Sequence, residues 1–233
     1  MKNKIIVCAL LLIGMNLGFS QGFINLNFES ADVSGYSSGT FNSIPMSQAF
    51  PGWNGAFISS TSTNGVSTAS YNVLPLSTAA ISIGDTNLMP YGAPLQGFYS
   101  ALLFGANGYA SEISQTGLVP SGSQSLLMDV ADVTGVAGGS FSVLLNGQDI
   151  NMIALQVLPS YTLYGGNASA FAGQVADLSI IVPQLANPND PNGWEFDAIR
   201  FSPTTVPEPT VLGLSALGSL FLALHRCRKS TKG

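Results

Sequence analysis

The chain has 233 residues, a formal net charge of −5 and a charged fraction of only 8%. Between residues 21 and 205 there are eleven acids and a single cation, Arg200, so this central part carries a charge of −10. Such a charge excludes binding to a nucleic-acid backbone, which requires clustered Lys and Arg, and disfavours anionic lipid surfaces.

Cysteine and histidine are confined to the two ends of the chain, as Cys8, Cys227 and His225. The central part therefore has no disulfide, no thiolate or histidine metal site and no Ser-His-Asp triad. The chemistry left to it is that of carboxylates: acid pairs for glycoside hydrolysis, or oxygen ligands for calcium.

Residues 1–20 have the pattern of a secretory leader. Lys2 and Lys4 give a short basic start, residues 5–17 are mostly apolar, and Gly18 and Ser20 are the small residues that precede a cleavage site. We expect a signal peptide that is cleaved after Ser20, and residues 1–20 are left out of the fold prediction.

Short apolar or alternating runs follow, each bounded by Gly, Pro, Asn or Ser, at 23–28, 80–83, 98–104, 125–130, 141–145, 152–158, 178–182 and 196–201. Their length is typical of strands, and Asn146-Gly147 between two of them predicts a tight hairpin. The polar stretch 31–79 is either long loops or edge strands. The pattern predicts an all-β chain with one two-sheet β-sandwich over residues 22–203.

Three local pieces, residues 27–30, 51–53 and 194–201, resemble parts of the jelly-roll, galactose-binding-like sandwiches of carbohydrate-binding modules. The resemblance implies that the first and last strands are neighbours. It also implies that Glu29 and Asp197, with backbone carbonyls, hold a structural calcium and that no other cofactor is needed. The alternative is that both acids are solvated, or that one of them pairs with Arg200.

Two tryptophans, Trp53 and Trp194, are the candidate ligand-binding residues, because flat aromatic faces suit sugar rings. Five tyrosines could join them: Tyr91, Tyr99, Tyr109, Tyr161 and Tyr164. The alternative for each tryptophan is core packing. Arg200 is expected to have a carboxylate partner, and strand alternation places it on the face opposite Asp197.

The chain ends with three consecutive features. Val206-Pro207-Glu208-Pro209 cannot continue a strand, because proline lacks an amide donor, but Pro209 can begin a helix. Residues 210–224 are apolar, and Arg226, Arg228, Lys229 and Lys232 follow. A fifteen-residue helix is about 22 Å long, short for a hydrocarbon core of about 30 Å. Terminal cations mark the cytoplasmic end.

This order of motif (206–209), transmembrane helix (210–224) and basic tail (226–232) resembles the PEP-CTERM sorting signal of bacterial exported proteins. The resemblance implies an exosortase-type membrane peptidase as a partner, and extracellular polysaccharide as the setting. It implies export across the inner membrane, anchoring through the C-terminal helix, and then a place at the cell surface or in the matrix. The alternative is an ordinary C-terminal anchor.

These observations lead to a first interpretation, a non-enzymatic exported β-sandwich of the envelope or matrix, with carbohydrate or exopolysaccharide as its ligand. The second is a purely structural surface protein with no specific ligand. The third, ranked last, is a carboxylate glycosidase that uses Glu112 and Glu195, although nothing in the sequence places these two residues together.

Overall fold

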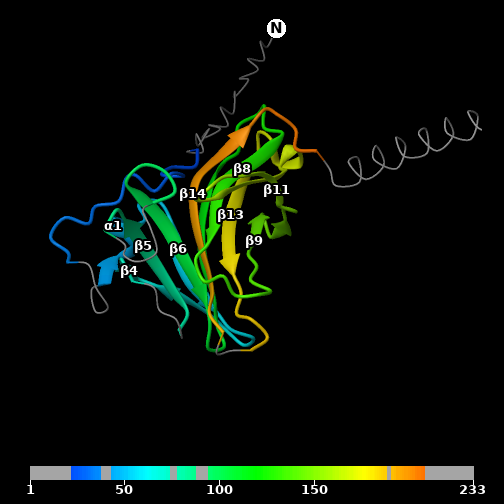
Figure 1. Cartoon of the computed structure of the whole chain (residues 1–233). Coiled ribbons are helices and arrows are strands. Elements are labelled where there is room, and N and C mark those ends of the chain that lie inside the picture. Colours follow the sequence, from blue (N-terminus) through cyan, green and yellow to red (C-terminus); the bar gives the residue numbers. More distant parts are fainter. Residues whose placement is uncertain (1–21, 38–42, 74–77, 88–93, 188–189, 208–233) are drawn as a thin grey trace, which may run out of the picture.

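The structure is a computed structural model, and it describes residues 22–37, 43–73, 78–87, 94–187 and 190–207. Almost all regular structure in this part of the chain is β-strand, arranged in two sheets (Figure 1). The prediction of an all-β, two-sheet sandwich is confirmed, and the arrangement is consistent with a jelly roll. Residues 1–20 and 210–224, the expected leader and membrane helix, lie outside the described residues. Within the described ranges, no helix is long and apolar enough to span a membrane.

The larger sheet has eight strands, in the spatial order β1 (Ser43–Pro45), β4 (Thr68–Tyr71), β5 (Ala80–Asp85), β6 (Tyr99–Gly105), β14 (Asn192–Ser202), β8 (Ser125–Asp132), β12 (Thr162–Asn167) and β11 (Ile153–Val157). The smaller sheet has six, in the order β10 (Gln148–Asp149), β9 (Ser142–Leu145), β13 (Val175–Val182), β7 (Ala110–Leu118), β2 (Asn54–Ile58) and β3 (Thr63–Val66). The helical elements are α1 (Met46–Ala49) and a 3-10 turn (Ser169–Phe171).

The inner faces of the two sheets form one large apolar core. Alternate residues of β8, namely Leu126, Met128 and Val130, are buried in it, as are Leu178 and Ile180 of β13. This period of two is what places one side of each strand against the other sheet. The intervening residues of β8 point to the outer face of the larger sheet, which carries part of the candidate site.

The prediction of a strand at residues 23–28 is wrong. The backbone turns there, and Asn25 and Phe28 have φ angles of 51° and 59°. A side chain takes the place of a neighbouring strand at Ile24. Gln115 Oε1 accepts from the Ile24 N–H, and Gln115 Nε2 donates to the Ile24 carbonyl, both at 3.0 Å. The segment still lies beside the last strand, since the N–H of Ile199 donates to the carbonyl of Leu26 at 3.0 Å.

Within the described part of the stretch 31–79, residues 31–37 form a loop, whereas β1, β2, β3 and β4 are strands, of which β1 and β3 lie at sheet edges. The Asn146-Gly147 hairpin is confirmed: the turn joins β9 to β10, and its φ angles of 51° and 74° lie in the left-handed region.

Candidate functional site

Glu29 and Asp197, the two acids selected from the sequence, hold the same short segment in front of β6. Asp197 Oδ2 accepts from the backbone N–H of Gln96 at 2.8 Å. Glu29 Oε1 accepts from the N–H groups of Phe98 at 2.8 Å and Tyr99 at 3.1 Å. The structure therefore brings the two acids to one loop, although the first of them does not follow a strand.

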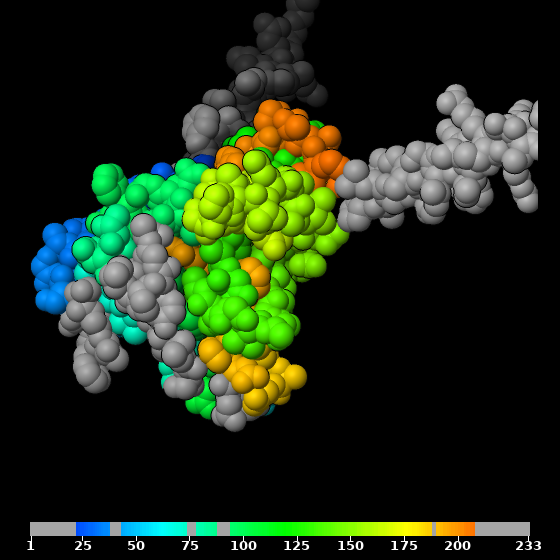
Figure 2. Space-filling view, in the orientation of Figure 1, coloured from blue at the N-terminus to red at the C-terminus, as the bar shows by residue number. Residues whose placement is uncertain are grey.

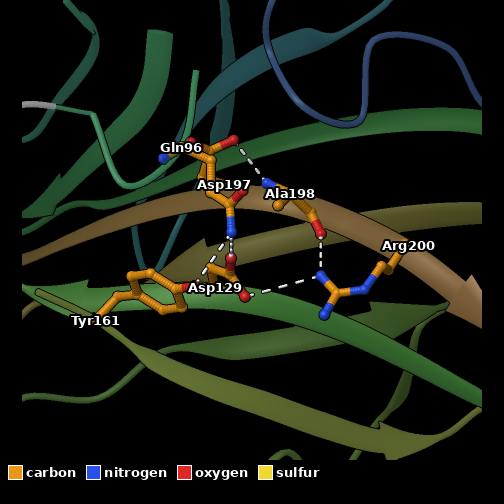
Figure 3. Close-up of polar contacts among 6 residues, drawn as sticks. All are labelled: Gln96, Asp129, Tyr161, Asp197, Ala198 and Arg200. Atoms are coloured by element: carbon orange, nitrogen blue, oxygen red, sulfur yellow. Dashed lines mark hydrogen bonds and ion pairs between the residues drawn. The ribbon is translucent and has the colours of Figure 1, made fainter. Parts of the chain in front are cut away.

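The side chain of Gln96 links this loop to two further elements (Figure 3). Its Nε2 donates to Asp129 Oδ2 on β8 at 2.7 Å and to the hydroxyl of Tyr161, just before β12, at 3.1 Å. One glutamine thus fixes the position of Tyr161 relative to the outer face of the larger sheet. Nothing in the sequence indicated this role for Gln96.

Arg200 has a carboxylate partner, as expected, but the alternation argument about its face is wrong. A bulge interrupts β14 between Asp197 and Arg200, and Ala198 there has a φ of 48°. Arg200 consequently lies on the face of Asp129, at 3.7 Å from its Oδ1, and also donates to the Ala198 carbonyl at 2.8 Å (Figure 3).

Two carboxyl groups of β14 are buried on this outer face: Asp197 is fully buried, and Glu195 is 3% exposed. The pKa of Asp197 is raised to about 7, mainly by burial and to a smaller extent by the charge of Glu29. Hydrogen bonds from the Gln96 and Ala198 N–H groups and from the Ser100 hydroxyl act in the opposite direction. Burial also raises the pKa of Glu195 to about 7, and the charge of Asp197 adds to the effect. Among the described residues, Glu195 Oε1 has no hydrogen-bond partner. Both groups therefore keep their protons in the folded chain up to about neutral pH.

A calcium ion at Glu29 and Asp197 stays a prediction. Within the described ranges, no group of three or more His, Cys, Asp or Glu side chains is placed to hold a metal. The oxygens of the pair face N–H and O–H donors: Asp197 Oδ2 also accepts from the Ser100 hydroxyl at 3.1 Å. A cation would have to displace these donors, because calcium is bound through lone pairs of oxygen.

Trp53 lies in the core. It is 4% exposed, its indole N–H donates to the Asn25 carbonyl at 3.0 Å, and its ring lies 5.7 Å from that of Phe28. This matches the core-packing alternative, and it leaves Trp194 as the tryptophan that a ligand can reach.

Trp194 is partly exposed and is held in place by a buried amide. Its indole N–H donates to Asn192 Oδ1 at 2.8 Å, and its ring meets the Phe141 ring edge-on, with centroids 5.0 Å apart. The Nδ2 of Asn192 in turn donates to the carbonyls of Ser140 at 2.8 Å and Pro183 at 2.7 Å. Sequence reasoning missed Asn192.

Trp194 and Tyr164 line two neighbouring hollows at one edge of the sandwich. One, of about 270 Å³, lies between β9, the β10–β11 connection and β12. The other, of about 290 Å³, lies under the turn at residues 158–161 and includes Tyr161. Orange atoms of the last strand are visible between the yellow-green and green surfaces that surround this region (Figure 2).

A third hollow, of about 520 Å³, continues from the first, because both are lined by Asp149, Ile150 and Asn151. We refer to the three together as the edge groove, with Asp149, Ile150, Asn151, Tyr164 and Trp194 as the residues that adjoining hollows share. The edge groove has the mixed aromatic and polar lining that is typical of small-molecule sites.

The remaining predicted residues are not brought together. Glu112 lies on β7 of the smaller sheet, whereas Glu195 lies on β14 of the larger one. Of the sorting motif, Val206 and Pro207 are described and line the third hollow. Glu208, Pro209, Arg226, Arg228 and Lys229 lie outside the described residues.

Comparisons with known proteins give a likeness in structure but none in sequence. No family model and no curated protein matches the chain. A solved structure, the enzymatically active domain of tailspike protein 4 of bacteriophage CBA120, is similar over 76% of this chain and 21% of its own, at 12% identity and a TM-score of 0.39. The chain thus spans about a fifth of that neighbour.

The prediction of a non-enzymatic protein is contradicted by this finding and is withdrawn. A likeness at this TM-score assigns no activity to the chain.

Proposed function

We propose that this protein is an exported β-sandwich that binds polysaccharide in the edge groove. The observation that carries the proposal is the position of Trp194, partly exposed at the boundary of two hollows and beside Tyr164. Aromatic rings with an apolar face and a polar tip suit the alternately apolar and hydroxylated faces of sugars.

The surroundings of Trp194 support a binding role. The indole is fixed by Asn192 and packed against Phe141, so little side-chain freedom is lost when a ligand stacks on it. Polar groups for sugar hydroxyls lie in the same lining, among them Asn151 and Ser142. The length of the groove, three adjoining hollows, favours a chain of sugar units over a single one.

The test is affinity electrophoresis of the chain in gels that contain soluble polysaccharides. We expect retardation by at least one polymer. Trp194→Ala should reduce affinity by roughly two- to twelvefold, since an aromatic stacking contact contributes about 0.5–1.5 kcal/mol beyond the area that it buries. Tyr109→Ala, which removes an exposed aromatic ring outside the groove, serves as the control. Equal loss in both variants would contradict the proposal. Lack of binding to any polymer would favour a purely structural protein. Release of reducing ends is measured in parallel, which distinguishes hydrolysis from binding alone.

Delivery by the C-terminal segment is the second part of the proposal. Its support is the sequence alone: Pro207-Glu208-Pro209, an apolar run and a basic tail, which an exosortase-type peptidase would process. The chain would be anchored in the inner membrane first and released to the cell surface or matrix. Cell fractionation tests this part: replacing residues 207–209 by Ala should leave the protein in the membrane fraction. An unchanged distribution between the fractions would contradict it.

Structural calcium at Glu29 and Asp197 remains part of the proposal.

A further inference from the structure

The charges around the edge groove are all of one sign. Asp149 is exposed and lines the first and third hollows, and Asp132 is exposed and lines the second. Arg200 is the only Lys or Arg between residues 22 and 207, and it is held against Asp129 on the outer face of the larger sheet. No described residue therefore brings a positive charge into the groove.

The two acids differ in how firmly they are held. Asp132 Oδ1 accepts from the N–H groups of Thr134 at 2.9 Å and Gly135 at 2.8 Å, which fixes its carboxylate at the rim. The Asp149 carboxylate forms no hydrogen bond or ion pair with another described residue. One acid is thus preorganised, and the other is available to a ligand.

We propose that the edge groove selects a polysaccharide with free amino groups and discriminates against one with carboxylate or sulfate groups. The inference rests on the polysaccharide site proposed above and adds the charge of its ligand. An anionic chain would meet Asp132 and Asp149 with no cation among the described lining residues to offset the repulsion, on a domain that carries −10. An ammonium group would pair with either carboxylate.

The expected size of the effect follows from the exposure of both acids. An exposed ion pair contributes up to about 1 kcal/mol, which corresponds to roughly a fivefold change in affinity per pair. Salt screens such pairs, so the preference should shrink strongly between about 20 mM and about 0.5 M salt. Stacking on Trp194 should change little over the same range.

The experiment uses the full chain in detergent and three polymers with one backbone: neutral glycol chitin, amino-bearing glycol chitosan and anionic carboxymethyl chitin. We expect affinity to decrease in the order amino, neutral, anionic at low salt. Asp149→Asn should weaken binding to the amino polymer about two- to fivefold and leave the neutral polymer unaffected. Glu112→Gln removes one charge from β7, at a residue that lines none of the three hollows, and should change neither.

The outcomes separate the two levels of the argument. Equal affinity for the three polymers would overturn the charge preference alone. Equal losses of affinity for the amino polymer in Asp149→Asn and Glu112→Gln would also overturn it, because they would indicate attraction to the whole domain. Binding to no polymer, or binding that survives Trp194→Ala, would overturn the proposed site and the charge preference with it.

Discussion

At the residue scale, the two buried carboxyl groups of β14 make stability depend on pH. The folded-state pKa values of Asp197 and Glu195 are about 7 because burial disfavours the charged form. In an unfolded chain both groups have pKa values near about 4. The folded protein therefore binds more protons than the unfolded chain between these values, and its free energy of unfolding falls as the pH rises through this window.

We therefore expect the melting temperature to decrease from pH 5 to pH 7.5 and then to level off. Over this window the free energy of unfolding should fall by up to about 1.4 kcal/mol per pH unit for each group. Glu195→Gln should flatten the curve, because Gln carries no proton to lose and Glu195 Oε1 has no hydrogen-bond partner among the described residues. Thermal melts over a pH series measure this. Asp177→Asn, at an exposed position of β13, is the control. A slope that Glu195→Gln leaves intact would contradict the account.

The sequence could select Asp197 and Glu29 because they occur at recognisable ends of the chain, but it could not show what they hold. Their partners are backbone N–H groups of a loop about 70 to 100 residues away along the chain. The bulge at Ala198 was equally invisible, since it depends on how β14 pairs with β8, and it reversed the predicted face of Arg200.

At the element scale, the chain remains attached to the domain up to the start of the sorting motif. The Ser125 hydroxyl donates to the Thr204 carbonyl at 2.7 Å, and the Thr204 N–H donates to Ser202 Oγ at 3.1 Å. Val206 packs beside Gly165 of β12: a Cβ at Gly165 would lie 3.0 Å from Val206 Cγ2. Val206 and Pro207, at the end of this attached segment, form part of the wall of the third hollow.

Two serines of one segment offer a matched test of this attachment. Ser125→Ala removes the hydrogen bond to Thr204 and should lower the free energy of unfolding by about 1 kcal/mol. Ser123→Ala removes a buried hydroxyl that has no hydrogen-bond partner among the described residues, and should be neutral or stabilising. Chemical denaturation measures both. Equal effects of the two changes would show that the segment is not held through Ser125.

Strand prediction succeeded where an apolar run is long and has a neighbour on each side. Residues 125–130 and 178–182 lie within β8 and β13, which both have this position. It failed at 23–28, where alternation was present but Gln115 took the place of a neighbouring strand. Polar β3 was undecided because an exposed edge strand needs no apolar face.

At the scale of the whole molecule, the edge groove lies where the β9–β10 edge of one sheet meets the β12–β11 edge of the other. Its lining comes from segments between residues 130 and 207, so no local stretch of sequence encodes it. The sequence could propose both tryptophans as ligand residues. Only the stacking of the sheets places Trp53 in the core and Trp194 at the groove.

The different burial of Trp53 and Trp194 allows the polysaccharide site to be tested directly. The chain has only two tryptophans, so Trp53→Phe leaves Trp194 as the sole source of indole fluorescence. On titration with a polysaccharide that the chain binds, we predict a saturable blue shift of this emission and protection from iodide quenching, because a sugar ring would cover the indole. The reciprocal variant, Trp194→Phe, should show neither change, since Trp53 is buried. Binding that leaves the Trp194 emission and its quenching unaltered would contradict the account.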